Sequence, residues 1–180
     1  MKKGPSLEQK LHAVIGGARA ILQKDNFIET ARAIFDYCRQ LTGAVSGYVA
    51  LLNVDGTENE VLFLEAGGLP CSVDPNLPMP IRGLRETVYK THKAAYENDF
   101  MNSKWLEFMP KGHVVMRNVM FAPINLKGKT VGVIGLANKP GDFTDQDAET
   151  SSWFGELASI SLKFNREMDK LKAEGDSLLY

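Results

Sequence analysis

Apolar residues near the start of the chain recur every three or four positions, and mostly polar or charged residues lie between them. This spacing predicts an amphipathic helix that begins after Ser6, a suitable N-cap residue. A second stripe of the same spacing covers residues 27–41 and stops at Gly43, as expected for a helix C-terminus. The adjacent Gly16 and Gly17 each cost the first helix about 1 kcal/mol relative to alanine. We therefore expect another helix to pack closely against the first one at these glycines.

Strand patterns dominate the middle of the chain. Residues 48–52 and 61–64 flank an Asn-Val-Asp-Gly turn and predict two antiparallel strands. Residues 118–126 and 130–138 are apolar runs separated only by Lys-Gly-Lys, which predicts a second hairpin. A short edge strand is expected at residues 94–96.

Three segments between the strands read as loops or short helices. Residues 67–80 are rich in Gly, Pro, Asp and Asn and predict an irregular loop, and residues 83–90 predict a short helix. Residues 98–113 carry aromatic and methionine side chains within a loop or short helix. Loops of this composition commonly cover ligand pockets, so we expect this segment to be a lid.

A last helix is predicted after Thr144, because two aspartates and then apolar residues at helical spacing follow this N-cap candidate. Its stripe includes Leu157, Ile160 and Phe164 and is longer than one small domain needs. We expect a homodimer through the first and last helices; a helix that only packs on the sheet is the alternative. From residue 172 the chain lacks a cap signal and is expected to be a linker, as in a piece of a longer protein.

Composition excludes several classes of protein. Lys and Arg number 21 against 22 Asp and Glu, and the formal net charge of -1 gives no field that would steer nucleic acid or an anionic membrane. No stretch approaches the roughly 20 apolar residues that span a bilayer, and the N-terminus does not resemble a secretory signal. Two cysteines are too few for a disulfide scaffold, so we expect a cytoplasmic protein with reduced thiols.

No arrangement typical of catalysis is apparent in the sequence. We find no nucleophile beside a base, no carboxylate pair and no phosphate-binding glycine loop. The histidines His12, His92 and His113 are not at metal-ligand spacing. We expect a protein that is not an enzyme and holds no metal.

Two loop residues are candidates for ligand contact. His113 lies beside a glycine on the expected pocket side, where it would touch a ligand or, alternatively, bond to backbone carbonyl groups. Cys71 in the Pro-rich loop would take a tetrapyrrole, ligate haem iron or respond to oxidants if its pKa were lowered. No cation adjoins it, so an inert thiol is the alternative. Cys38 falls on an apolar helix stripe and is expected in the core.

Aromatic and methionine side chains suited to a flat or hydrophobic ligand surround the expected pocket, with core packing as the alternative. They are Trp105, Phe108, Met109, Met116, Met120 and Phe121. Since Met120 and Phe121 alternate along a strand, at most one of them faces the pocket. Arg82, Arg85 and Arg117 are candidates to clamp a carboxylate or phosphate, with surface ion pairing as the alternative.

The order of the predicted elements resembles the GAF domain family over residues 27–164. Residues 77–84 resemble the family's entry into the helix that flanks its pocket. Residues 110–113 resemble a Pro-x-Gly-His turn of bacterial and archaeal sensor-kinase members. The resemblance implies an α+β, GAF-like (PAS-related) fold. It has a central antiparallel sheet of five to six strands, terminal helices on one face, and ligand-side loops and short helices on the other.

A third motif matches a family signature, Asn-Lys-Phe-Asp-Glu, of cyclic-nucleotide-binding members. Four of its positions are present as Asn138, Lys139, Phe143 and Asp147, and Ala148 replaces the final glutamate. In the family this signature is mainly structural and includes a Lys–Asp ion pair. The resemblance therefore assigns these residues to stability rather than to ligand contact.

The family implies a sensory role and leaves the ligand open. Its members bind haem, tetrapyrroles, cyclic nucleotides or small metabolites, and the sequence indicates none of these cofactors. We expect a small-molecule-sensing domain of a signal-transduction protein, such as a two-component histidine kinase, with an output domain elsewhere. Residues 1–26 would form a signalling and dimerisation helix, 27–164 the GAF domain, and 165–180 a helix extension and linker. The alternatives are a ligand-free dimerisation or interaction module and, least favoured, a small redox enzyme of the same fold.

Overall fold

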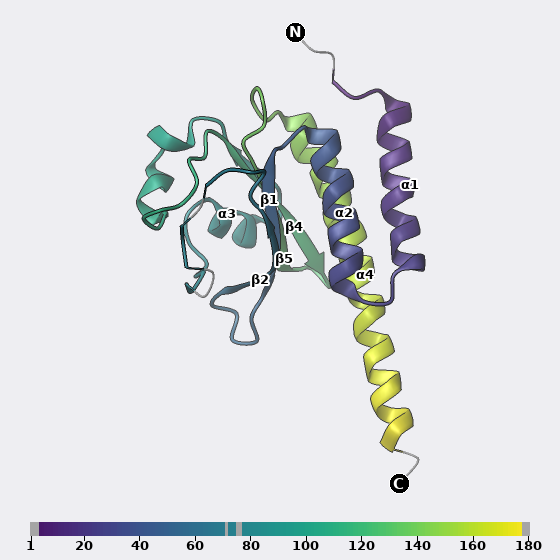
Figure 1. The fold of residues 1–180 in the computed structure, drawn as a ribbon. Coiled ribbons are helices and arrows are strands. Elements are labelled where there is room, and N and C mark those ends of the chain that lie inside the picture. The colour runs from purple at the N-terminus through teal and green to yellow at the C-terminus, as the bar shows by residue number, and fades with distance from the viewer. Residues whose placement is uncertain (1–3, 71, 75–76, 178–180) are drawn as a thin grey trace.

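The computed structural model describes residues 4–70, 72–74 and 77–177 (Figure 1). It is an α+β fold in which one sheet lies between a helical layer and a layer of loops with a short helix. In chain order the elements are α1 (Leu7–Gln23), α2 (Phe27–Thr42), β1 (Ser46–Leu52), β2 (Asn59–Glu65), α3 (Leu84–Thr91), β3 (Ala95–Glu97), the 3-10 turns η1 (Phe100–Asn102) and η2 (Lys104–Phe108), β4 (Val119–Leu126), β5 (Lys129–Ala137) and α4 (Asp145–Ser177).

The sheet has five strands in the order β2-β1-β5-β4-β3, and all neighbours are antiparallel. This agrees with the predicted sheet of five to six strands. The β4–β5 hairpin turns at Lys127 and Gly128, whose φ angles of 52° and 76° are the left-handed values that a tight hairpin turn requires. Long-range pairing of β1 with β5 joins the two predicted hairpins into one sheet.

The terminal helices cover one face of the sheet, as predicted (Figure 1). Helices α2 and α4 pack directly on the strands, and α1 packs on α2 and α4. A Cβ on Gly17 would lie 2.9 Å from Leu157 Cδ1, and one on Gly16 would overlap the ring of Tyr37. The expected close helix contact at the two glycines is therefore confirmed.

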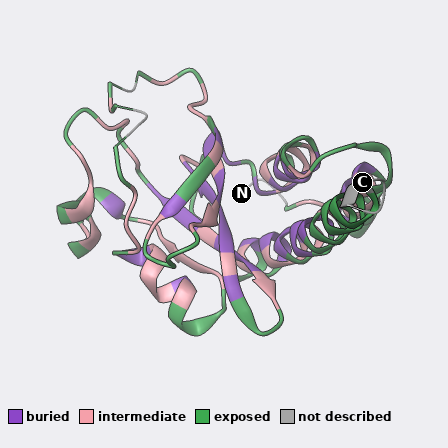
Figure 2. Ribbon diagram, turned by 90° about the horizontal axis from the view of Figure 1, so that it is seen from below, coloured by how far each residue is buried: buried purple, intermediate pink, exposed green. Residues whose placement is uncertain are grey.

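Two apolar clusters fill the two sides of the sheet. The larger cluster lies between sheet and helices and includes Ile34, Phe35 and Phe154, each fully buried. The smaller cluster lies on the opposite face, here called the distal face, and is built on Leu84, Phe100, Val119 and Ala137. Figure 2 shows buried residues along the strands and on the sides of the helices that turn toward them.

The end of the chain differs from the prediction. Helix α4 continues to Ser177, whereas a linker was expected from residue 172. Lys, Ala and Glu at positions 172–174 are strong helix formers, so the helix continues although it projects beyond the rest of the domain (Figure 1). The absence of a cap signal was therefore a poor indicator of where this helix ends.

Candidate functional site

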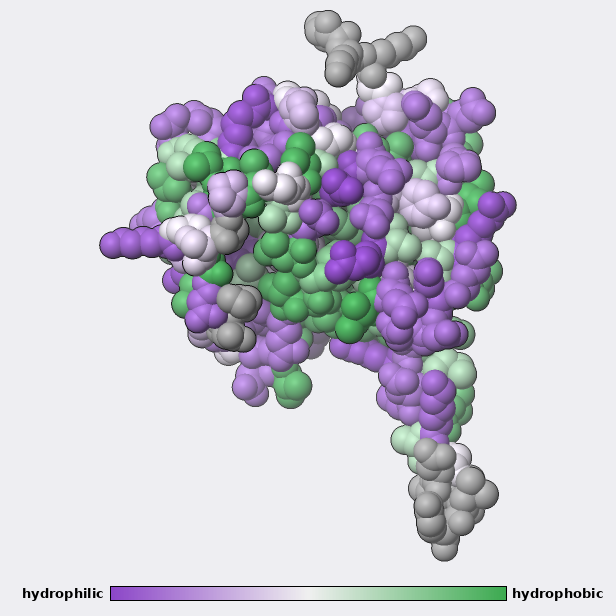
Figure 3. Space-filling model, in the orientation of Figure 1, coloured by the Kyte–Doolittle hydropathy of each residue, from purple (hydrophilic) through white to green (hydrophobic). Residues whose placement is uncertain are grey.

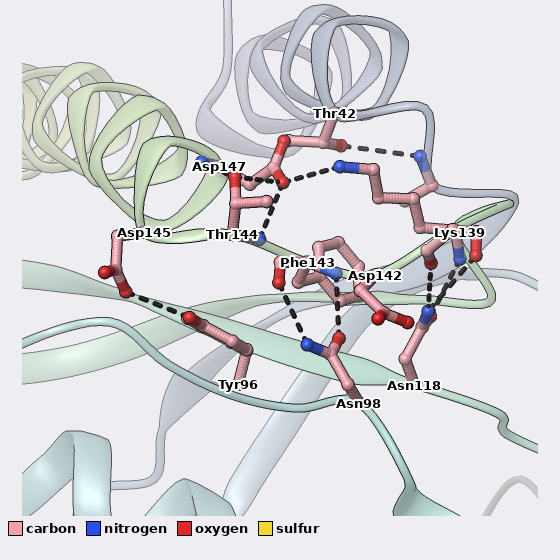
Figure 4. A network of polar contacts seen from close by, with 12 residues as sticks. Thr42, Tyr96, Asn98, Asn118, Lys139, Asp142, Phe143, Thr144, Asp145 and Asp147 are labelled. Carbon is pink, nitrogen blue, oxygen red and sulfur yellow. Dashed lines mark hydrogen bonds and ion pairs between the residues drawn. The ribbon is translucent and has the colours of Figure 1, made fainter. Parts of the chain in front are cut away.

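The signature residues close the loop between β5 and α4 (Figure 4). Lys139 Nζ lies 2.5 Å from Asp147 Oδ2, and both side chains are mostly buried. The same carboxylate accepts hydrogen bonds from the Thr144 N–H and hydroxyl, both at 2.8 Å, and the Asp147 N–H donates to Thr144 Oγ1. Thr144 is thus the predicted N-cap. The Lys–Asp ion pair that the resemblance implied is present and fixes the start of α4.

Two asparagines that the sequence analysis did not single out hold this loop from the other side (Figure 4). Asn98 donates to the Phe143 carbonyl and accepts from the Phe143 N–H, at 2.9 and 2.8 Å. The fully buried Asn118 accepts from the Lys139 N–H and donates to the carbonyls of Lys139 and Gly141. These bonds satisfy backbone groups that would otherwise be buried unpaired.

Asn138 has a backbone role. Its φ of 57° is left-handed, a conformation that asparagine tolerates better than most residues. Its side chain accepts from the Arg117 N–H and donates to the Val115 carbonyl. Arg117 itself donates to the carbonyls of Lys139 and Gly141, so this candidate anion clamp is engaged in the loop. The signature residues therefore hold the loop between β5 and α4 in place, and we call this loop with its contacts the β5–α4 joint.

The candidate ligand residues divide between the two faces of the sheet. Trp105, Met109, Met116 and Phe121 pack together against the distal cluster. Met120 is fully buried in the cluster on the helix side, because alternation along β4 turns it away from Phe121. Met120 is therefore wrong as a candidate for contact with a distal ligand.

Arg82 and Phe108 lie together at the start of α3. The Arg82 guanidinium donates to the Phe108 carbonyl at 3.3 Å and lies 5.7 Å from the centre of its ring. A Cβ on Gly83, which has a φ of 68°, would lie 3.1 Å from the same ring. Glycine therefore permits the close approach of α3 to the η2 loop.

His113 bonds to backbone, which was the alternative to ligand contact. Its Nδ1 lies 2.9 Å from the Val114 carbonyl oxygen, and since a carbonyl only accepts, Nδ1 carries the proton. The adjacent turn is tied to the Pro-rich loop, where the Ser72 N–H donates to the Gly112 carbonyl at 3.0 Å. The candidate Cys71 lies outside the described residues.

A polar group on the distal face was only partly foreseen. We call it the Arg85 group, and it consists of Arg85, Tyr48, Tyr89 and Asn59. Arg85 donates to the Tyr48 hydroxyl at 3.3 Å and to the Pro80 carbonyl at 3.2 Å. The Tyr89 hydroxyl donates to Asn59 Oδ1 at 2.7 Å. Arg85 was a sequence candidate, and Tyr89 lies one turn further along α3. The sequence pattern that could have identified Tyr48 is its place next to Val49 on β1. Val49 is buried, and alternation along the strand puts Tyr48 on the opposite face of the sheet.

The Arg85 group lies beside aromatic rings over the middle of the sheet. The rings of Tyr48 and Phe121 are 6.1 Å apart, and a Cβ on Gly135 between them would lie within 3.1 Å of each ring. Burial raises the pKa of Tyr89, Tyr48 raises it further, and Arg85 opposes both. The hydroxyl of Tyr89 is therefore a neutral donor near pH 7.

Arg85 lacks a carboxylate partner in the part of the chain that the structure describes. Its side chain is half-buried, and it donates to a phenol and a backbone carbonyl. A partly desolvated guanidinium without a countercharge is poised to pair with an anionic group. The Arg85 group thus combines one cation, two phenols and an amide beside apolar rings.

The described residues hold no group of three or more His, Cys, Asp or Glu side chains able to bind a metal. The thiol of Cys38 is fully buried, and this burial raises its pKa to about 12, with Ser151 opposing the shift and Asp147 adding to it. The thiol is therefore protonated and unreactive near neutral pH. No described helix has the length and apolar character needed to cross a bilayer.

Comparison with known families gives one match. A family model described as the GAF domain matches residues 25–163, most of the chain. No curated protein matches the sequence.

Solved structures with the same fold are distant in sequence. The GAF domain of an Acinetobacter phosphoenolpyruvate-protein phosphotransferase is 13% identical, with a TM-score of 0.73 over 91% of this chain and 97% of that one. The GAF domain of a putative sensor histidine kinase from Pseudomonas syringae pv. tomato is 12% identical, with a TM-score of 0.61 over 93% and 94%. A free methionine-R-sulfoxide reductase from Neisseria meningitidis, solved with its substrate, is also 12% identical, with a TM-score of 0.73 over 93% and 98%. At these identities the likeness shows the fold alone.

Proposed function

The chain belongs to the GAF domain family, and we propose that it is a non-catalytic sensory domain that binds an anionic small molecule on the distal face. The matched family and the signalling proteins among its structural neighbours support a sensory or regulatory role. The observation that carries the ligand proposal is Arg85, a half-buried cation without a carboxylate partner among the described residues.

The ligand would bind between α3, the η2 loop and the sheet. Arg85 would pair with its carboxylate or phosphate, the hydroxyls of Tyr48 and Tyr89 would orient it, and Phe121 would contact its apolar part. The rings of Tyr48 and Phe121 pack over Gly135, so a flat group could enter there only if these rings moved apart. The ligand must displace the Arg85–Tyr48 hydrogen bond, so binding would rearrange the distal layer.

Coupling to an output domain, such as a kinase, would run through the joint between β5 and α4. Asn98 and Asn118, next to the ends of β3 and β4, connect the sheet to the loop that the Lys139–Asp147 pair closes. A ligand that favours one arrangement of this loop would bias the packing of α4 and of a homodimer formed through the terminal helices.

A ligand-free interaction module is the second candidate. Side chains of the protein already occupy the distal face, since Tyr48 and Phe121 flank Gly135 and the Arg85 group is internally hydrogen-bonded. A domain of this kind would serve only to dimerise.

A redox enzyme is the least favoured candidate. This candidate rests on one enzyme of the same fold, the free methionine-R-sulfoxide reductase. The described thiol, Cys38, is buried and has a raised pKa, and that chemistry requires reactive thiolates.

Native mass spectrometry of the freshly purified protein tests the sensory proposal. We expect a small-molecule mass that is present under native conditions and lost on denaturation, and that is absent from Arg85→Gln. Arg19→Gln, which removes the same charge from the exposed face of α1, should retain it. A clean apo mass, together with no rise in the melting temperature on adding a panel of small carboxylates and phosphates, would favour the ligand-free module.

A further inference from the structure

A hollow lies away from the distal face, between the tip of the β4–β5 hairpin and α4. Its volume is about 370 Å³, within the size range of small-molecule sites. Leu126 and Val131 are half-buried and form its apolar part. The remaining lining residues are charged: Lys127, Lys129, Lys163, Arg166, Lys170 and Glu167.

Five cations and one carboxylate line this hollow, in a chain whose formal net charge is -1. The hollow is therefore net positive, while the rest of the molecule is net negative. A concave surface with one sign of charge focuses the electrostatic field and raises the local concentration of counter-ions. The hollow is an electropositive groove on a protein that is otherwise weakly acidic.

Most of these cations lack partners. Lys170 pairs with Glu167 at 3.7 Å, and both are exposed. Lys127, Lys129, Lys163 and Arg166 make no ion pair or side-chain hydrogen bond with any residue that the structure describes. Glu167 is therefore the carboxylate that offsets this charge among the lining residues, and the hollow keeps a net positive charge.

The backbone holds the cations in this arrangement. The tight turn with left-handed Lys127 and Gly128 brings the hairpin cations beside the helix. On α4 the cations at positions 163, 166 and 170 share one side, because they are separated by three and four residues. The stripe that contains Ile160 and Phe164 adjoins that side, since Lys163 follows Ile160 by three residues.

We propose that this groove binds a phosphate-bearing anion of at least two negative charges, such as a diphosphate or triphosphate group. Lysine is a point-charge partner for phosphate and arginine can bind it through two hydrogen bonds. A chain of phosphates carries enough charge in a small volume to contact hairpin and helix together. The apolar part at Leu126 and Val131 offers room for an organic body attached to the phosphates.

The groove site is independent of the distal ligand site. Its occupant would bridge the hairpin tip and α4, two elements that otherwise repel each other through their cations. Binding would therefore stabilise the position of the exposed half of α4. A nucleic acid would need a longer basic surface than this single hollow provides.

Isothermal titration with sodium triphosphate tests the proposal. We expect one saturable site per chain, with an affinity that falls as NaCl rises from about 50 to about 300 mM, because screening weakens exposed charge pairs. In the double variant Lys129→Gln/Lys163→Gln the Kd should rise at least about tenfold, which corresponds to about 1.4 kcal/mol of binding free energy. Lys93→Gln/Lys111→Gln removes the same charge from exposed positions outside the groove and should bind normally.

A second experiment, with lipid vesicles, distinguishes a free phosphate compound from a lipid headgroup as the bound anion. Binding of triphosphate without retention on vesicles that contain a phosphoinositide supports a free anion, whereas retention lost in the groove variant supports a lipid headgroup. The proposal is overturned if triphosphate does not bind, if both double variants bind equally, or if a poly-glutamate peptide or an oligonucleotide binds more tightly than triphosphate. Melting curves without anion confirm that both variants are folded. None of these outcomes depends on Arg85. Failure of the groove proposal therefore does not contradict the proposal that an anion binds on the distal face.

Discussion

The Lys139–Asp147 pair can be separated from the hydrogen bonds around it by a double-mutant cycle of Lys139→Met and Asp147→Asn. The two side chains are 18% and 11% exposed, so Asp147→Asn alone should cost about 3 kcal/mol by leaving a mostly buried ammonium without its countercharge. The coupling energy from urea unfolding should be about 1–3 kcal/mol.

The matched control for this cycle is the Lys90–Glu86 pair on α3. Its atoms are also 2.5 Å apart, but its side chains are 71% and 43% exposed, and we expect a coupling of only about 0.3–0.5 kcal/mol. Equal coupling in the two cycles would mean that burial does not strengthen the signature pair and that Asn98 and Asn118 hold the loop instead.

Single residues were predictable from the sequence where a local rule or a motif applies. Thr144 and the Lys139–Asp147 pair are such cases. Asn98 and Asn118 were not, because an asparagine in a loop usually bonds to its own turn, and these two bond to a segment more than twenty residues away. Alternation along β4 separated Met120 from Phe121 but did not indicate which of them faces the helices.

At the scale of elements, α4 approaches the sheet closely at Gly155. A Cβ there would overlap the Pro123 carbonyl oxygen of β4, which is backbone and cannot rotate away. Helix propensity alone would make Gly155→Ala stabilising by about 1 kcal/mol. We expect a net loss of stability of about 1–3 kcal/mol instead, measured by urea unfolding, because overpacking separates helix and strand.

Gly175→Ala is the control on the same helix. A Cβ on Gly175 meets nothing within 4 Å, so the substitution should raise the helical circular dichroism signal without lowering the free energy of unfolding. If Gly155→Ala behaves like Gly175→Ala, the helix does not pack on β4 as closely as described.

Elements with strong periodicity were predicted well, and irregular ones were not. The first two helices begin after Ser6 and Asn26, whose side chains cap them, and the second ends at Gly43 as expected. The segment 98–113 contains two 3-10 turns, which have no sequence period that distinguishes them from a loop. The pairing of β1 with β5 was not predicted from the residues, because contacts distant in sequence leave no local pattern.

Among the described residues, two groups of exposed apolar side chains bear on association. Figure 3 shows apolar side chains gathered over the middle of the face near the viewer. On the edge strand β2, Val61 and Leu64 are 42% and 55% exposed. The second region runs along the terminal helices. Its exposed members are Leu7, Leu11, Ile15 and Leu22 of α1 and Ile160, Phe164, Met168 and Leu171 of α4. Exposed apolar stripes at helical spacing are typical of helix–helix interfaces.

The predicted stripe needs one correction before it can be tested. Leu157 was expected in the interface, but it is partly buried and packs against the core and Gly17. A charge at Leu157 would therefore destabilise the domain itself. Ile160 and Phe164 are 56% and 55% exposed and are the suitable positions.

If the chain forms a homodimer through its terminal helices, Ile160→Glu and Phe164→Glu should each weaken it at least about tenfold, because two carboxylates would face each other across an apolar contact. The melting temperature of the monomer should change little, since both side chains are exposed. Leu64→Glu is the control, with the same exposure and the same charge on the other apolar region. Sedimentation velocity over a range of concentrations measures the mass. Dissociation by Leu64→Glu alone would move the interface to the edge of the sheet, and a wild-type monomer would leave no dimer for the helices to regulate.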